Sequence, residues 1–63
     1  MAKYYVNNSP QPNGDHEVHK EGCYWLGLAA SKKELGYYYS CEAAVLAAKI
    51  TYKQSNGCIH CSK

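Results

Sequence analysis

The sequence contains no arginine and no phenylalanine, and its formal net charge is only +2. Proteins that bind nucleic acid usually carry clustered positive charge, with arginines that contact phosphates and base edges. The lysines of this chain are scattered rather than grouped. A protein partner is therefore favoured, and binding of single-stranded nucleic acid is the weaker alternative.

Long hydrophobic runs are also missing. No stretch approaches the roughly 20 apolar residues that a membrane-spanning helix needs, and residues 1–5 lack the apolar run of a secretory signal peptide. We therefore expect no membrane association and a cytoplasmic location. In such a reducing compartment, cysteines serve more often as metal ligands or reduced thiols than in disulfides.

The chain is short. With 63 residues it is expected to form one domain, residues 1–63, whose hydrophobic core is too small to stabilise it strongly. Four cysteines and three histidines are the side chains able to supply further support, either as a disulfide or as a metal site.

Strand and helix signals together predict an α+β fold. Runs rich in tyrosine, valine and tryptophan predict three strands, at residues 3–7, 16–26 and 35–39. A helix is predicted over residues 41–53, followed by a tail over 54–63. The expected architecture is a three-stranded antiparallel sheet packed by one C-terminal helix, with the cysteine-bearing tail folded back onto the sheet.

The predicted helix has ordinary end signals and a face of small residues. Ser40 or Cys41 can cap its start, and Glu42 in the first turn suits the helix dipole. At 100° per residue, one face carries small side chains that would let the helix lie close to the sheet, namely Ala44, Ala47, Ala48 and Thr51. Leu46 lies outside this face and is a candidate for partner contact.

Cys58 and Cys61 form a C-x-x-C motif, a spacing that allows two thiolates to bind one tetrahedral ion. A helix running back along the third strand would end near the end of the second strand, which is where Cys23 lies. Cys23, Cys58 and Cys61 are therefore predicted to converge on a structural zinc ion. A Cys23–Cys58 disulfide and reduced thiols without a metal are the alternatives.

The fourth ligand is harder to assign. His19 precedes Cys23 by four residues, which is about 13 Å along an extended strand, so His19 can contribute only if the chain bends. Gly22 could introduce a bulge that moves Cys23 to the other face of the strand. His60 lies awkwardly within the C-x-x-C motif. Cys41, at the helix start, is expected to fill space in the core.

The sequence offers no set of residues typical of an enzyme. The histidines of His16-Glu17-Val18-His19 are three residues apart on a predicted strand, whereas the zinc protease motif needs them four apart on a helix. The C-x-x-C motif follows a helix, whereas redox motifs of this kind lie at a helix start. We therefore expect a non-enzymatic interaction module, with thiol or metal handling by the C-x-x-C motif as the alternative.

Tyrosine supplies most of the aromatic content and suits contact surfaces. Tyr37 and Tyr39 share one face of the third predicted strand, and Trp25 lies at the end of the second. With Leu46, these residues are the candidate partner-binding positions. The open edges of a three-stranded sheet could also pair in a homodimer.

Several stretches of the chain are similar to a family of short, uncharacterised bacterial proteins. The most specific is the run from Gly14 to Cys23, in which GDHEVH is followed after two residues by Gly-Cys, and the C-terminal Gly-Cys-x-x-Cys also matches. In that family a further cysteine or histidine follows the C-x-x-C motif, where this sequence has Ser62 and Lys63. The resemblance implies a compact fold and no known activity.

Overall fold

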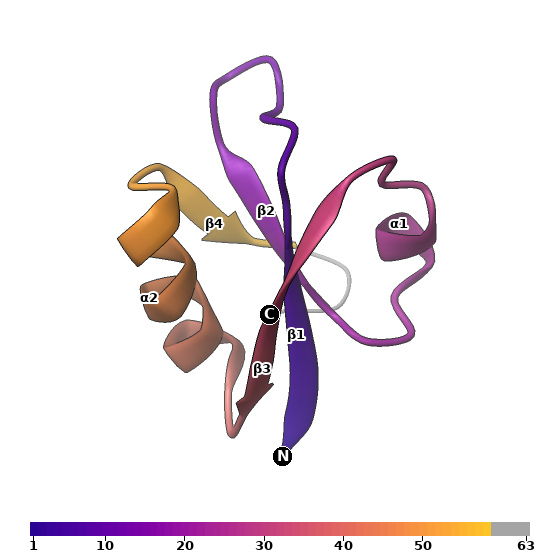
Figure 1. Cartoon of the computed structure of the whole chain (residues 1–63), viewed down its shortest axis with the longest axis vertical. Helices are drawn as coiled ribbons and strands as arrows, with labels where there is room; N and C mark the ends of the chain where they lie inside the picture. Colours follow the sequence, from indigo (N-terminus) through magenta and orange to yellow (C-terminus); the bar gives the residue numbers. More distant parts are fainter. Residues whose placement is uncertain (59–63) are drawn as a thin grey trace.

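The alternation of side chains in the first strand sets up the two faces of the sheet. In the computed structural model, which describes residues 1–58, strand β1 spans Ala2–Asn7 and buries Tyr4 and Val6 on one face. β1 pairs antiparallel with β2, His16–Lys20, on one side and with β3, Lys32–Tyr38, on the other. The first strand of the chain is therefore central in the sheet (Figure 1).

The sheet has a fourth strand that the sequence does not predict. Residues Ser55–Gly57 form β4, which pairs with β2 in parallel and completes the order β3-β1-β2-β4. The α+β class is confirmed, but the expected three-stranded antiparallel sheet is wrong, because residues taken as tail join the sheet in a mixed arrangement.

The second predicted strand, residues 16–26, also ends earlier than expected. β2 stops at Lys20, and Gly22 turns the chain with a φ of 93°, a left-handed conformation that glycine adopts without steric cost. Instead of continuing as a strand, Tyr24–Gly27 forms a short helix, α1. The structure therefore has two helices rather than one, and Figure 1 shows α1 and α2 on opposite sides of the strands.

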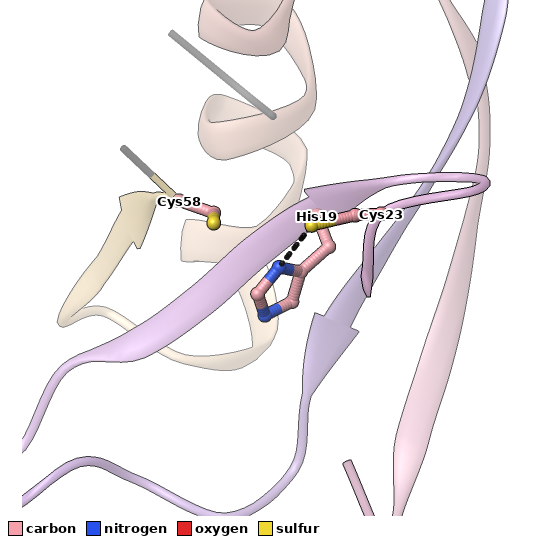
Figure 2. Close-up of side chains that lie close together, drawn as sticks. All are labelled: His19, Cys23 and Cys58. Carbon is pink, nitrogen blue, oxygen red and sulfur yellow. Dashed lines mark hydrogen bonds between the residues drawn. The ribbon is translucent and has the colours of Figure 1, made fainter. Parts of the chain in front are cut away.

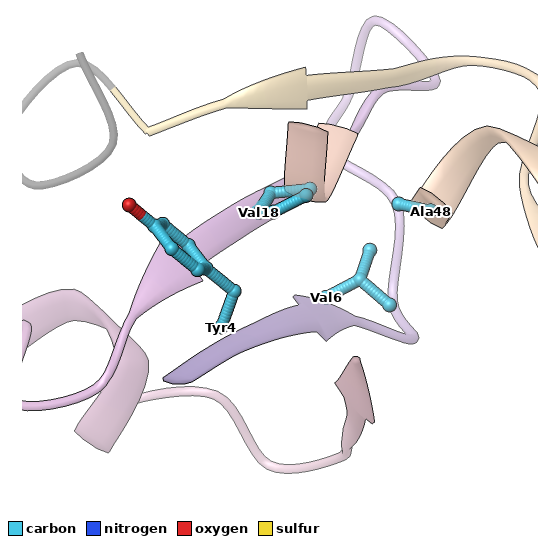
Figure 3. Packing of buried hydrophobic residues seen from close by; sticks show 5 residues of the cluster. Tyr4, Val6, Val18 and Ala48 are labelled. Carbon is cyan, nitrogen blue, oxygen red and sulfur yellow. The ribbon is translucent and has the colours of Figure 1, made fainter. Parts of the chain in front are cut away.

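Helix α2, Cys41–Thr51, begins and packs as its sequence indicates. The Ser40 side chain accepts a hydrogen bond from the Ala43 N–H at 3.3 Å. Ala44 and Ala48 are fully buried against the sheet face that carries Val6 and Val18. Figure 3 shows Ala48 beside these two valines. The predicted close contact through small residues is confirmed for these two alanines, whereas Thr51 is exposed.

Asn8, after β1, and His16, at the start of β2, contact the residues that follow α2. The His16 ring stacks on the Tyr52 ring, with centroids 3.8 Å apart and an interplanar angle of 9°. The Tyr52 hydroxyl donates to Asn8 Oδ1 at 2.8 Å, and the His16 N–H donates to the Gln54 carbonyl at 2.9 Å. These contacts hold the chain beside β2 just before Ser55.

Within residues 1–58, neither helix has the length and apolar character that a membrane crossing requires.

The close approach of α2 gives a first prediction. Ala48→Leu should destabilise the protein by about 1–3 kcal/mol, because a larger side chain cannot fit between the helix and Val6 or Val18 without moving them. Lys49→Leu places the same side chain at the next, exposed position and is the matched control. Urea unfolding of both variants measures the difference, and equal stabilities would contradict the packing described.

Candidate metal centre

Strand β2 buries side chains on both of its faces. Val18 is fully buried in the core beneath α2, and the next residue, His19, is only 1% exposed although it points to the opposite face. His19 lies opposite Tyr5 of β1 in the antiparallel register. A buried histidine outside the apolar core needs polar partners of its own.

Cys58 reaches His19 through the parallel pairing of β2 and β4. Val18 pairs with Gly57, and the Cys58 N–H donates to the Val18 carbonyl at 2.9 Å. Continuing this register by one residue places Cys58 beside His19 on the neighbouring strand, with its side chain on the same face. The Cys58 side chain is 1% exposed.

Cys23 reaches His19 through the turn at Gly22. The Cys23 N–H donates to the Lys20 carbonyl at 3.1 Å, which folds the chain back on the end of β2. Cys23 Sγ then lies 3.6 Å from His19 Nδ1 (Figure 2). The bend that His19 needs in order to contribute as a ligand is therefore present, because the strand ends and turns between His19 and Cys23, and the separation of about 13 Å along an extended strand does not apply.

The three ligand atoms have nearly the spacing of a tetrahedral metal site. One nitrogen of His19 and the sulfurs of Cys23 and Cys58 all lie within 4.8 Å of one another. Zinc bonds of about 2.0–2.1 Å to nitrogen and 2.3 Å to sulfur imply ligand separations of about 3.6–3.8 Å. The observed group would need to contract by only about 1 Å to bind an ion. No disulfide joins Cys23 to Cys58 in the structure.

The charge state of His19 suits metal binding. Burial lowers the pKa of His19 below its ordinary value of 6.5, and the nearby Glu17 carboxylate opposes this shift. Glu17 Oε1 lies 3.6 Å from His19 Nε2. The imidazole is therefore neutral near pH 7, which is the form that coordinates metals.

Comparison with protein-family models, with curated proteins and with solved structures finds no match to this chain.

The structure brings together three of the four predicted metal ligands. His19, Cys23 and Cys58 form the group described above, while Cys61, like His60, lies outside the described residues 1–58. Cys41 is partly buried at the start of α2 and packs against the apolar core. The signal that could have assigned His19 is the glycine directly before Cys23, which favours a turn rather than a continued strand.

The predicted partner-binding residues are exposed but lie on different elements. Tyr37 on β3 is 60% exposed and Tyr39 after it 89%, while Trp25 on α1 is 46% exposed and Leu46 on α2 66%. Tyr37, Trp25 and Leu46 thus belong to three different elements, β3, α1 and α2. The sequence interpretation did not identify two more exposed side chains near Trp25. These are Tyr24, which it placed in a strand, and Leu28, which follows α1.

β3, which forms one edge of the sheet, carries features that oppose pairing with another strand. β3 begins with the exposed residues Lys32 and Lys33, and its register with β1 shifts at Leu35, which has no partner between Glu34 and Gly36. Edge lysines and bulges are common devices against edge-to-edge association.

The pKa of His19 predicts how acid affects the metal-free protein. Because the folded pKa lies below the unfolded value, the unfolded chain binds a proton first, and stability falls as the pH drops below about 6.5. The slope from this one group should reach at most about 1.4 kcal/mol per pH unit. Urea unfolding with a chelator at several pH values measures it. A slope unchanged in His19→Gln would contradict this account.

Proposed function

We propose that the protein is a small, non-enzymatic binding module whose fold is completed by one structural zinc ion. His19, Cys23 and Cys58 hold the ion, and Cys61 is the fourth ligand. The observation that supports this proposal is the spacing of three ligand atoms within 4.8 Å, contributed by two segments far apart in the chain. Cys61 enters through its C-x-x-C spacing from Cys58, which lets two thiolates reach one ion.

The chemistry of these donors favours zinc over the common alkaline-earth ions. An imidazole nitrogen and thiolate sulfurs suit a borderline-soft ion, whereas calcium and magnesium prefer oxygen ligands. The thiols remain reduced, and so able to bind, in a cytoplasmic setting. The donor set therefore supports zinc as the ion.

Burial supports a structural rather than a catalytic role for the ion. Catalytic zinc sites keep one coordination position open to substrate or water, whereas structural sites are closed. His19 and Cys58 are each only 1% exposed. A zinc ion here would join the turn after β2 to the chain after β4, which stabilises a protein whose apolar core is small.

The exposed side chains of α1 support a role in binding a protein partner. Tyr24, Trp25 and Leu28 are 72%, 46% and 59% exposed, and the rings of Tyr24 and Trp25 meet edge to face at 5.4 Å. Tyrosine and tryptophan are enriched at protein interfaces. Since α1 directly follows Cys23, the proposed zinc centre would hold this surface in place.

Zinc binding tests the proposal directly. The wild-type protein should bind one zinc ion, and each of Cys23→Ser, Cys58→Ser and His19→Ala should weaken binding by roughly a hundredfold, since a ligand contributes about 3 kcal/mol. Cys41→Ser is the matched control and should bind like the wild type. Competition with a chromophoric chelator measures the affinities. Equal loss in the Cys41 variant, or none in the others, would count against the proposal.

Removing the metal should loosen α1 more than α2. Trp25 is the only tryptophan and lies two residues after Cys23, so its fluorescence reports on this helix. A chelator should shift its emission toward longer wavelengths, because a less ordered α1 exposes the indole further. The helical circular dichroism signal of the protein, which comes mainly from the longer helix α2, should change little. An emission spectrum that does not respond to zinc would show that the ion does not order α1.

A further inference from the structure

The two nitrogens of the His19 ring lie near different groups, one near a thiol and the other near a carboxylate. Nδ1 lies 3.6 Å from Cys23 Sγ, on the side of the sulfurs (Figure 2). Nε2 lies 3.6 Å from Glu17 Oε1. Glu17 is thus close to the histidine but separated by the ring from the group that would hold the ion.

The position of Glu17 follows from the strand. Glu17 and His19 are two residues apart on β2, so their side chains point to the same face of the sheet. The other carboxylates on this face have partners of their own. Glu34 forms an ion pair with Lys3 at 3.2 Å, and Glu21 accepts the Tyr5 hydroxyl at 3.5 Å. Glu17 is the one directed at His19, and its side chain is only 26% exposed.

We infer that Glu17 is the positioning residue of the metal centre: its carboxylate accepts a hydrogen bond from the Nε2–H of His19, which keeps the proton on Nε2 and makes Nδ1 the metal-binding atom. This inference rests on the proposed zinc site. A neutral imidazole carries one proton, so a metal on Nδ1 requires the proton on Nε2. A carboxylate beside Nε2 stabilises that tautomer, fixes the ring orientation and makes Nδ1 a stronger donor.

The distance is compatible with this role. At 3.6 Å the contact is longer than a hydrogen bond, and a shortening of about 0.7 Å would bring it to the usual 2.9 Å. Metal binding supplies a reason for that shortening, because an ion on Nδ1 withdraws electrons from the ring and makes the Nε2 proton more acidic.

Substitution of Glu17 tests the inference. Glu17→Ala should weaken zinc binding 10–100-fold while leaving the ligands unchanged. Glu17→Gln keeps an oxygen acceptor without the charge and should fall between Glu17→Ala and the wild type. Glu21→Ala removes a carboxylate from the same face and is the matched control. Chelator competition measures affinity, and the absorption spectrum of the cobalt-substituted protein should be the same in all variants.

The tautomer of His19 provides a readout that a loss of packing would not change. In the zinc-loaded wild type, ¹⁵N NMR should show Nδ1 bound to metal and the proton on Nε2. A metal-bound Nε2, or a Glu17→Ala affinity within twofold of Glu21→Ala, overturns the role of Glu17 while leaving the zinc site intact. A wild type that binds no zinc overturns the proposed function and this inference together.

Discussion

The parallel pairing of β4 with β2 is the interaction on which the arrangement of the protein depends. It is short, with Ser55–Gly57 as the whole of β4, yet it places Cys58 beside His19. Parallel neighbours need a crossover connection, and the chain from β2 to β4 runs through α1, β3 and α2. The stack of His16 on Tyr52 then fixes the point at which the chain enters β4. Without this register, the cysteine would not lie on the face that carries the histidine.

The protein stabilises the two faces of its sheet by different means. One face packs Val6 and Val18 against the alanines of α2, which is an ordinary apolar core. On the other face, within residues 1–58, the turn at Cys23 contacts His19, and α1, which follows this turn, has Leu26 as its single buried residue. A four-residue helix of this kind buries little apolar surface and is not stable by itself in water. The two sulfurs and the imidazole are the strongest candidates for what holds it.

Local signals in the sequence were sufficient for the parts of the fold that depend on neighbours in the chain. The Ser40 cap and the buried alanines Ala44 and Ala48 were predictable because helix periodicity and capping act within a few residues. β4 was not, since Ser55-Asn56-Gly57 has little strand propensity and is extended because β2 lies beside it. Likewise, the residues after Gly22 favour a strand by composition, but a left-handed glycine turned them into α1. The candidate metal ligands were proposed from residue type, while their spacing depends on the non-local pairing of β2 with β4 and on the turn at Gly22.

In the proposed function, the metal centre and the exposed surface of α1 are linked by a single residue step, from Cys23 to Tyr24. An ion that orders the turn also lowers the entropy that a partner must remove when it binds Trp25 and its neighbours. Linkage makes this effect reciprocal, so a partner that binds only the ordered α1 must strengthen metal binding by the same factor. Protein recognition and zinc affinity would therefore be two measures of one equilibrium, the closing of the Cys23 turn over His19.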